Sequence, residues 1–191
     1  SAQAAVIFSE DFDDELAGNN NNSQLNFNNF DQLTVTEQSV DLIKSGTFSI
    51  TCETAACVDL DGSSSSGGTL TSDAINFVAG VSYELTFRVS GNQRGGADDT
   101  FEFGLTNGLI NSTVLSSGDG FADFTLNFAA IGDFSDSFFI RDLGDDNVGV
   151  IVDSITLTDS SLAAVPLPAG LPLLLAGLGG IGMFARKTRK S

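Results

Sequence analysis

Two carboxylates interrupt rows of apolar residues near the two ends of the strand-rich part of the chain. Glu10 lies between Phe8 and Phe12 in an alternating pattern, and Asp153 shares the row of Ile151 two positions earlier. An ionised carboxylate that is buried alone is strongly unfavourable. Each of these side chains must therefore be ion-paired, protonated, bound to a metal or turned to solvent by a β-bulge.

The first and last strands of a two-sheet sandwich can lie side by side, which would bring these two carboxylates together. Calcium binds six to eight oxygen ligands, including carboxylates and backbone carbonyls. We predict a structural calcium site formed by Glu10, Asp11, Asp13 and Asp153. The alternative is that bulges turn Glu10 and Asp153 to solvent.

A second polar group follows the alternating segment 83–89. Asn92, Gln93 and Arg94 lie between glycines, and their amide and guanidinium groups can donate to sugar hydroxyls or to a carboxylate of an acidic polysaccharide. We predict that these three residues bind a ligand. The alternative is that Arg94 pairs with Asp98 or Asp99 and fixes its own loop.

The two cysteines, Cys52 and Cys57, are close enough in sequence to close a small disulfide loop in an oxidising compartment. The alternative is a pair of buried free thiols. The chain contains no histidine, which removes most zinc sites and the Ser-His-Asp and Cys-His catalytic arrangements.

The dominant hydrophobic period from Val6 onward is two. Clear alternation covers residues 83–89, 101–105 and 124–128, and glycine-rich turns separate such segments. This pattern predicts an all-β domain over residues 6–160, a β-sandwich of the jelly-roll type. Most of the 16 phenylalanines are expected in its core.

The charge of the chain restricts its partners. It has 25 acidic and 8 basic residues and a net charge of −17. Nucleic acid and anionic membrane surfaces are therefore poor partners, whereas divalent cations and neutral polymers are compatible with it. Carboxylate pairs are too numerous for any one of them to indicate a glycosidase, so we expect no enzymatic activity.

The last residues of the chain follow the order of segments that is typical of a membrane anchor. Residues 171–191 comprise an apolar stretch followed by a basic cluster, which predicts a single transmembrane helix with its end in the cytoplasm. Residues 161–170 form a linker. The small residues at 1–5 have the form of a signal-peptide remnant, so we expect export of the domain between them.

The linker carries the motif Val165, Pro166, Leu167, Pro168, Ala169. The order of motif, short apolar helix and basic cluster resembles the PEP-CTERM class of sorting signals in its VPLPA variant. The resemblance implies an exosortase-type processing enzyme as partner, transient anchoring in the inner membrane, and a final location at the cell surface or outside the cell.

A second resemblance covers most of residues 6–158. Segments 57–62, 67–72, 90–96 and 146–153 are similar to exported domains that precede this tail, which resemble galactose-binding-like carbohydrate-binding modules. It implies the fold more than any ligand. The acidic surface and the predicted calcium site favour a non-catalytic matrix protein that packs with copies of itself and with exopolysaccharide. The alternatives are a carbohydrate-binding module with a defined glycan ligand and, less favoured, a glycoside hydrolase.

Overall fold

The computed structural model describes residues 4–63, 67–144 and 146–160. The predicted linker with its sorting motif, the transmembrane helix and the first three residues of the signal-peptide remnant lie outside these ranges. No helix in the described part of the chain is long and apolar enough to cross a membrane.

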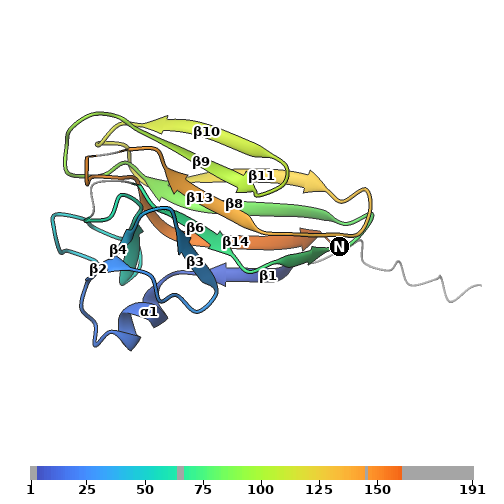
Figure 1. The fold of residues 1–191 in the computed structure, drawn as a ribbon, viewed down its shortest axis with the longest axis horizontal. Helices are drawn as coiled ribbons and strands as arrows, with labels where there is room; N and C mark the ends of the chain where they lie inside the picture. Colours follow the sequence, from blue (N-terminus) through green and yellow to red (C-terminus); the bar gives the residue numbers. More distant parts are fainter. Residues whose placement is uncertain (1–3, 64–66, 145, 161–191) are drawn as a thin grey trace, which may run out of the picture. The chain divides into compact units, whose positions relative to one another are not determined.

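The described residues form a sandwich of two antiparallel sheets (Figure 1). The larger sheet has the order β11-β8-β14-β5-β4-β2, and β1 pairs with β14 beside this path. Its strands are β1 (Ala5–Glu10), β2 (Gln24–Phe27), β4 (Val40–Lys44), β5 (Ala56–Asp59), β8 (Ser82–Ser90), β11 (Ala122–Ala129) and β14 (Ile151–Ser160). The first and last strands are therefore neighbours, as expected.

The smaller sheet has the order β10-β9-β13-β6-β3. Its strands are β3 (Leu33–Thr36), β6 (Thr69–Ser72), β9 (Asp99–Leu105), β10 (Ile110–Leu115) and β13 (Phe138–Asp142), and a separate ribbon pairs β7 (Ile75–Phe77) with β12 (Phe134–Asp136). This arrangement confirms the all-β sandwich predicted from the alternating pattern.

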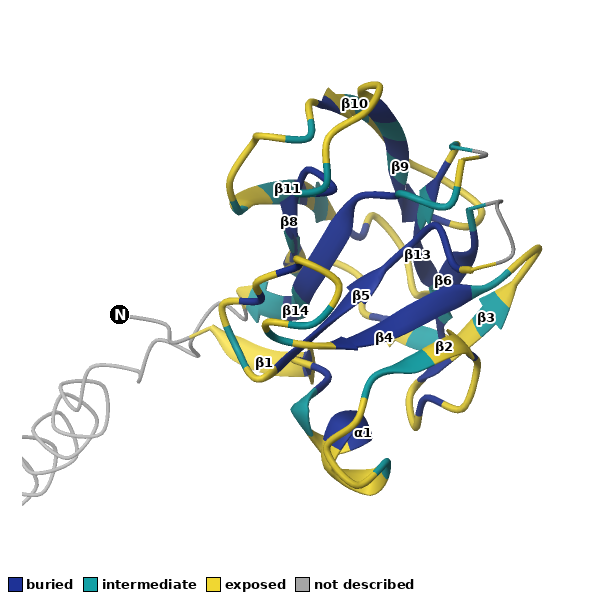
Figure 2. Ribbon diagram, turned by 90° about the vertical axis from the view of Figure 1, so that its left-hand side faces the viewer, coloured by how far each residue is buried: buried dark blue, intermediate teal, exposed yellow. Residues whose placement is uncertain are grey.

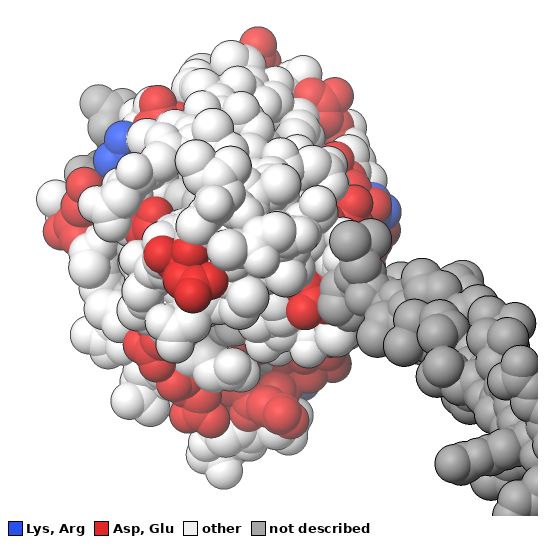
Figure 3. Space-filling model, turned by 90° about the vertical axis from the view of Figure 1, so that its right-hand side faces the viewer, with Lys and Arg blue, Asp and Glu red and all other residues white. Residues whose placement is uncertain are grey.

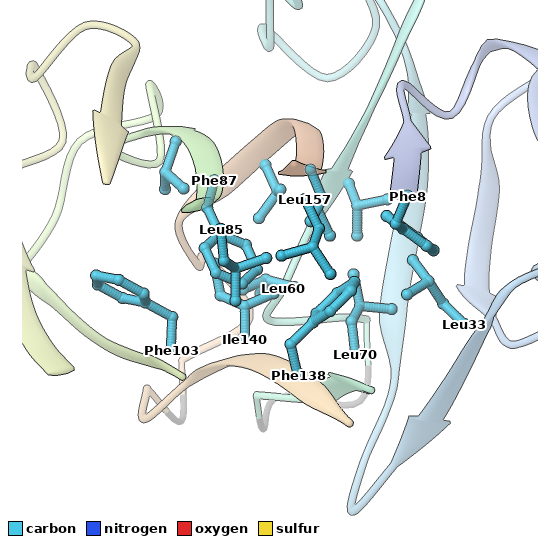
Figure 4. Packing of buried hydrophobic residues seen from close by; sticks show 14 of the residues in the cluster. Phe8, Leu33, Leu60, Leu70, Leu85, Phe87, Phe103, Phe138, Ile140 and Leu157 are labelled. Carbon is cyan, nitrogen blue, oxygen red and sulfur yellow. The ribbon is translucent and has the colours of Figure 1, made fainter. Parts of the chain in front are cut away.

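The core lies between the two sheets, where the inward-facing side chains of both sheets meet (Figure 4). These side chains alternate with outward-facing ones along each strand. Leu85, Phe87 and Leu157 come from the larger sheet, and Phe103 and Phe138 from the smaller one. The rings of Phe87 and Phe103 contact each other edge to face, with centroids 5.4 Å apart. Most phenylalanines are core residues, as predicted. β4 and β5 are buried along most of their length, and β14 is buried mainly in its first half (Figure 2).

A short helix, α1 (Asp13–Gly18), follows β1 and was not predicted, because six residues are too few to show a helical period. Phe12 precedes it with a φ of 63°, a left-handed backbone that bulky residues seldom adopt. Glu10 Oε1 accepts the Phe12 N–H at 2.6 Å and holds this turn, while Phe12 and Leu16 pack into the core.

Cys52, in the connection between β4 and β5, forms a disulfide with Cys57 on β5, which confirms the predicted pair. Both residues belong to a second, smaller apolar cluster with Ile43, Ile50 and Ile151, on the side of the larger sheet that faces away from the main core. The disulfide therefore fixes a loop that covers this side.

We expect the disulfide to stabilise the domain modestly, because it closes a loop of only a few residues. A loop of this length removes about 2 kcal/mol of chain entropy from the unfolded state. Reduction should lower the denaturant midpoint accordingly. A Cys52→Ala/Cys57→Ala variant should start from the lower midpoint and not respond to reductant. An unchanged midpoint on reduction of the wild-type protein would contradict the assignment.

Candidate functional site

The loop after β8 holds the three residues predicted to bind a ligand, and all three make internal contacts. Asn92 is buried and donates to Asp99 Oδ2 at 2.8 Å, and its own Oδ1 accepts the Arg94 N–H at 2.8 Å. Arg94 forms an ion pair with Asp59 on β5. The partner of Arg94 is therefore Asp59 instead of the two neighbours considered above. Ligand binding by Asn92, Gln93 and Arg94 stays a prediction.

The Arg94–Asp59 pair lies inside a network of backbone donors. The Asp59 side chain is 1% exposed, and its Oδ1 accepts the N–H groups of Asp61 and Gly149, each at 3.1 Å. Burial raises the pKa of Asp59, and the Arg94 guanidinium and these two N–H groups oppose the rise. The pair thus joins the loop after β8 to β5 and to the segment that leads into β14.

Three more carboxylates crowd this end of the sandwich. Asp61 accepts the N–H groups of Asp146 and Asn147 at 3.2 and 3.0 Å. Asp142 accepts the N–H groups of Gly144 and Val150 at 2.5 and 2.9 Å. Burial, together with the charges of Asp142, Asp146 and Asp61, raises the pKa of Asp99 to about 6, although the Asn92 amide lowers it.

Gln93 differs from its two neighbours because it both anchors a loop and lines an open groove. Its Oε1 accepts the Thr51 N–H at 2.9 Å, and its Nε2 donates to the Thr51 carbonyl at 3.1 Å. The groove has a volume of about 430 Å³ and is lined by Thr51, Cys52, Glu53, Gln93 and residues 117–121. We call it the disulfide groove.

The disulfide groove has an apolar wall and polar rims. Phe121 is partly exposed, and its ring packs on the small cluster around Cys52 and Ile151. Glu53 on one rim makes two hydrogen bonds to Arg88, at 2.7 and 2.8 Å, which hold the pKa of Glu53 below its usual value against a small opposing effect of burial. Phe121 was not predicted as a surface aromatic, because it precedes a strand in which phenylalanines alternate.

A close approach of two loops shapes this groove. The Gly91 N–H donates to the Asp119 carbonyl at 3.0 Å, and the Gln93 N–H donates to the Ser117 carbonyl at 3.0 Å. A Cβ atom at position 91 would lie 1.9 Å from the Ser116 carbonyl oxygen, so only glycine fits there.

Asp153 lies beneath the loop between β4 and β5. The pairing of β14 with β8 shifts register between Val152 and Ser154, so a bulge does occur at Asp153. The bulge does not turn the side chain to solvent, since Asp153 is only 2% exposed. Its Oδ1 accepts the N–H groups of Glu53 and Thr54 at 2.6 and 3.2 Å. Burial raises its pKa, against these two bonds.

Asp11 and Asp13, two other residues of the predicted calcium site, contact the same loop. Asp13 Oδ1 accepts the Ala56 N–H at 2.9 Å, and its charge contributes to raising the pKa of Asp153. The Asp11 carbonyl accepts the Thr54 hydroxyl at 3.4 Å. The structure thus brings Asp11, Asp13 and Asp153 to one loop.

Glu10 makes its contacts elsewhere. It is 8% exposed, and it interacts with Glu15 of α1, a residue that sequence reasoning missed. The alternative that Glu10 turns to solvent is wrong. Among the described residues, no group of three or more Asp, Glu or Cys side chains is placed to hold a metal ion. Calcium at the predicted set of Glu10, Asp11, Asp13 and Asp153 stays a prediction.

Comparison with known proteins supports the fold. No family model matches the chain, and no curated protein matches it. Among solved structures, the xylan-binding CBM22-1 domain from Paenibacillus barcinonensis is similar over 85% of this chain and 99% of its own, with a TM-score of 0.53 and 10% identity. An adhesin domain of Lys-gingipain from Porphyromonas gingivalis is similar over 82% and 99%, with a TM-score of 0.50 and 10% identity. The protein is therefore an all-β sandwich that resembles carbohydrate-binding-module jelly rolls.

Removal of the Arg94 charge tests the ion pair. Arg94→Met leaves Asp59 buried without its cation, and breaking a buried pair in this way costs roughly 3–5 kcal/mol. Arg88→Met is the matched control, because Glu53 and Asp123 are largely exposed and surface pairs are worth about 0–1 kcal/mol. Equal losses of unfolding free energy in the two variants would show that the Arg94–Asp59 pair is not buried as described.

The crowded carboxylates predict a pH dependence of stability. The pKa of Asp99 is about 6 in the folded protein, above the usual value of 3.8. The folded state therefore binds more protons than the unfolded state between these values, and stability falls as pH rises through 6. Asp99→Asn should reduce the fall in melting temperature between pH 4.5 and 7.5, whereas Asp98→Asn, which removes an exposed charge next to it, should not. A profile that is the same in both variants would contradict this.

Proposed function

We propose that the protein is an exported, non-catalytic glycan-binding module that takes a neutral polysaccharide in the disulfide groove. The observation that carries the proposal is the composition of this groove. Phe121 offers a partly exposed ring against which the apolar face of a sugar can pack, and the hydroxyl and amide groups of Thr51, Ser117 and Gln93 lie at its rims.

The charge distribution favours a neutral ligand. In the described part of the chain, Arg88, Arg94 and Arg141 each form ion pairs with carboxylates. Figure 3 shows a face on which carboxylates far outnumber basic side chains. The charged residues that line the groove itself are Glu53 and Asp119, so an acidic polysaccharide would meet repulsion there.

The carboxylates of the groove do not suit glycosidase chemistry. A glycoside hydrolase needs a carboxyl group that stays protonated near neutral pH as general acid. Glu53 has the opposite tendency, since Arg88 lowers its pKa. Asp119 accepts the N–H and the hydroxyl of Ser116 within its own turn. Both groups can instead accept hydrogen bonds from sugar hydroxyls.

The similar fold of a xylan-binding domain supports the class of function but does not identify the glycan. The location follows from sequence alone: the sorting motif at 165–169, the apolar stretch and the basic end favour an exosortase-type processing enzyme as partner, a transient membrane anchor, and release to the cell surface or an exopolysaccharide matrix. The disulfide fits an oxidising compartment. Self-association, and calcium at the predicted set of Glu10, Asp11, Asp13 and Asp153, are part of this proposal.

Affinity electrophoresis in gels that contain neutral or acidic polysaccharides tests the proposed function. Xylan, mixed-linkage β-glucan and pullulan represent the neutral class, and alginate represents the acidic one. We expect retardation by at least one neutral polymer and none by alginate. Phe121→Ala should weaken binding about two- to tenfold, since packing on an aromatic ring is worth about 0.5–1.5 kcal/mol.

Phe48→Ala is the control for this experiment, because Phe48 is 53% exposed and does not line the groove. It should bind like the wild-type protein. Binding that survives Phe121→Ala in a folded variant would place the ligand elsewhere, and retardation by alginate alone would contradict the preference for neutral polymers.

A further inference from the structure

A small cavity between β1, α1 and the segment before β3 is lined almost entirely by acidic residues. It has a volume of about 230 Å³, and its lining consists of Ser9, Glu10, Asp11, Asp14, Glu15, Asp31 and Gln32. We call it the acidic cavity. A second hollow of about 210 Å³ shares Asp14, Glu15 and Asp31 with it. Among the described residues, no basic side chain lines either hollow.

Glu15 is a buried acidic residue whose carboxylate lacks a full set of hydrogen-bond donors among the described residues. It is 8% exposed, and its Oε1 accepts only a long hydrogen bond from the Asp31 N–H at 3.4 Å. Its Oε2 is buried and has no hydrogen-bond partner among the described residues. A buried carboxylate oxygen without a donor is costly, so a group that compensates it is expected in the cavity that it lines.

Glu10 places a second buried carboxylate beside Glu15. It is also 8% exposed, and its side chain interacts directly with that of Glu15. Two neighbouring buried carboxylates cannot both stay ionised without a cation beside them. The Phe12 N–H satisfies one oxygen of Glu10 but brings no full positive charge. Either a metal ion or a shared proton is required.

We propose that Glu10 and Glu15 bind a divalent cation of the calcium type in the acidic cavity. Calcium accepts carboxylates and water in a flexible shell of six to eight oxygens. The described residues include no group of three side chains placed to hold a metal ion, so this is a site of two carboxylates completed by water. A cavity of about 230 Å³ has room for several waters, each of which occupies about 30 Å³ in the liquid.

Asp14 and Asp31 line the same cavity and add negative charge around the ion. Such a site is expected to be weak, with a Kd of about 10⁻⁴ to 10⁻³ M, as in extracellular calcium-binding modules. It would tie the end of β1 to α1 and to the segment around Asp31. It shares Glu10 with the predicted set. It differs from that set in the other three residues, Asp11, Asp13 and Asp153, whose contacts are with the loop between β4 and β5.

A calcium titration of the chelator-treated wild-type protein, followed by amide NMR, separates these possibilities without a mutation. We expect saturable shifts for the amides of Glu15, Leu16 and Asp31, and none of that size on addition of magnesium. Shifts confined to residues 53–56 and 153 would overturn the proposal, because the ion would then lie at the other set. The absence of any shift would mean that the two glutamates share a proton instead.

Thermal melting of variants is a second test of the proposed calcium site. At about 100 times Kd, calcium should raise the melting temperature of the wild-type protein by about 5 to 10 °C. Glu15→Gln should lose this rise or most of it. Glu84→Gln removes an exposed acidic charge on β8 and should respond like wild type. A rise in melting temperature in Glu15→Gln as large as in the wild-type protein would overturn the proposal. If Glu15→Gln does not fold, Glu10→Gln replaces it in the same experiment.

Discussion

Buried carboxylates that accept backbone N–H groups determine how the loops of this protein are held. Asp59, Asp61, Asp142 and Asp153 each accept two main-chain N–H groups from loop segments. The two bonds oppose the rise in pKa that burial causes in each of these carboxyl groups. With few basic side chains to pair with its acids, the protein uses its own backbone as the compensating partner, and the loops take the positions that this requires.

The sandwich and the groove depend on these contacts in different ways. The sheets are held by the apolar residues between them, which need no charge. The disulfide groove is formed by connections, and each has a polar anchor: Asp153 holds the loop with Cys52, Gln93 holds Thr51, and the N–H groups of residues 91 and 93 hold the turn at 117–119. The strands therefore provide the scaffold, and the polar anchors give the surface its shape.

The fold was predictable because its signal is periodic, whereas the site was not. Alternation placed β8, β9, β11 and most of β14, and the sequence marked Glu10 and Asp153 as carboxylates in apolar rows. We expected each of these two carboxylates to be ion-paired, protonated, bound to a metal or exposed to solvent. We did not expect backbone N–H groups to be their partners. Glu15 and the Asp59–Arg94 pair were missed because their partners are 5 and 35 positions away in the chain, across turns whose geometry no local pattern specifies.

Amide hydrogen exchange tests this account most directly, because the N–H groups in question lie in loops and would exchange quickly if they were open to water. The amides of Gly149, Val150 and Glu53 donate to Asp59, Asp142 and Asp153. They should exchange as slowly as amides in the centre of β14. If they exchange as fast as those of the exposed turn at 131–133, the carboxylates do not hold the loops and the account is wrong.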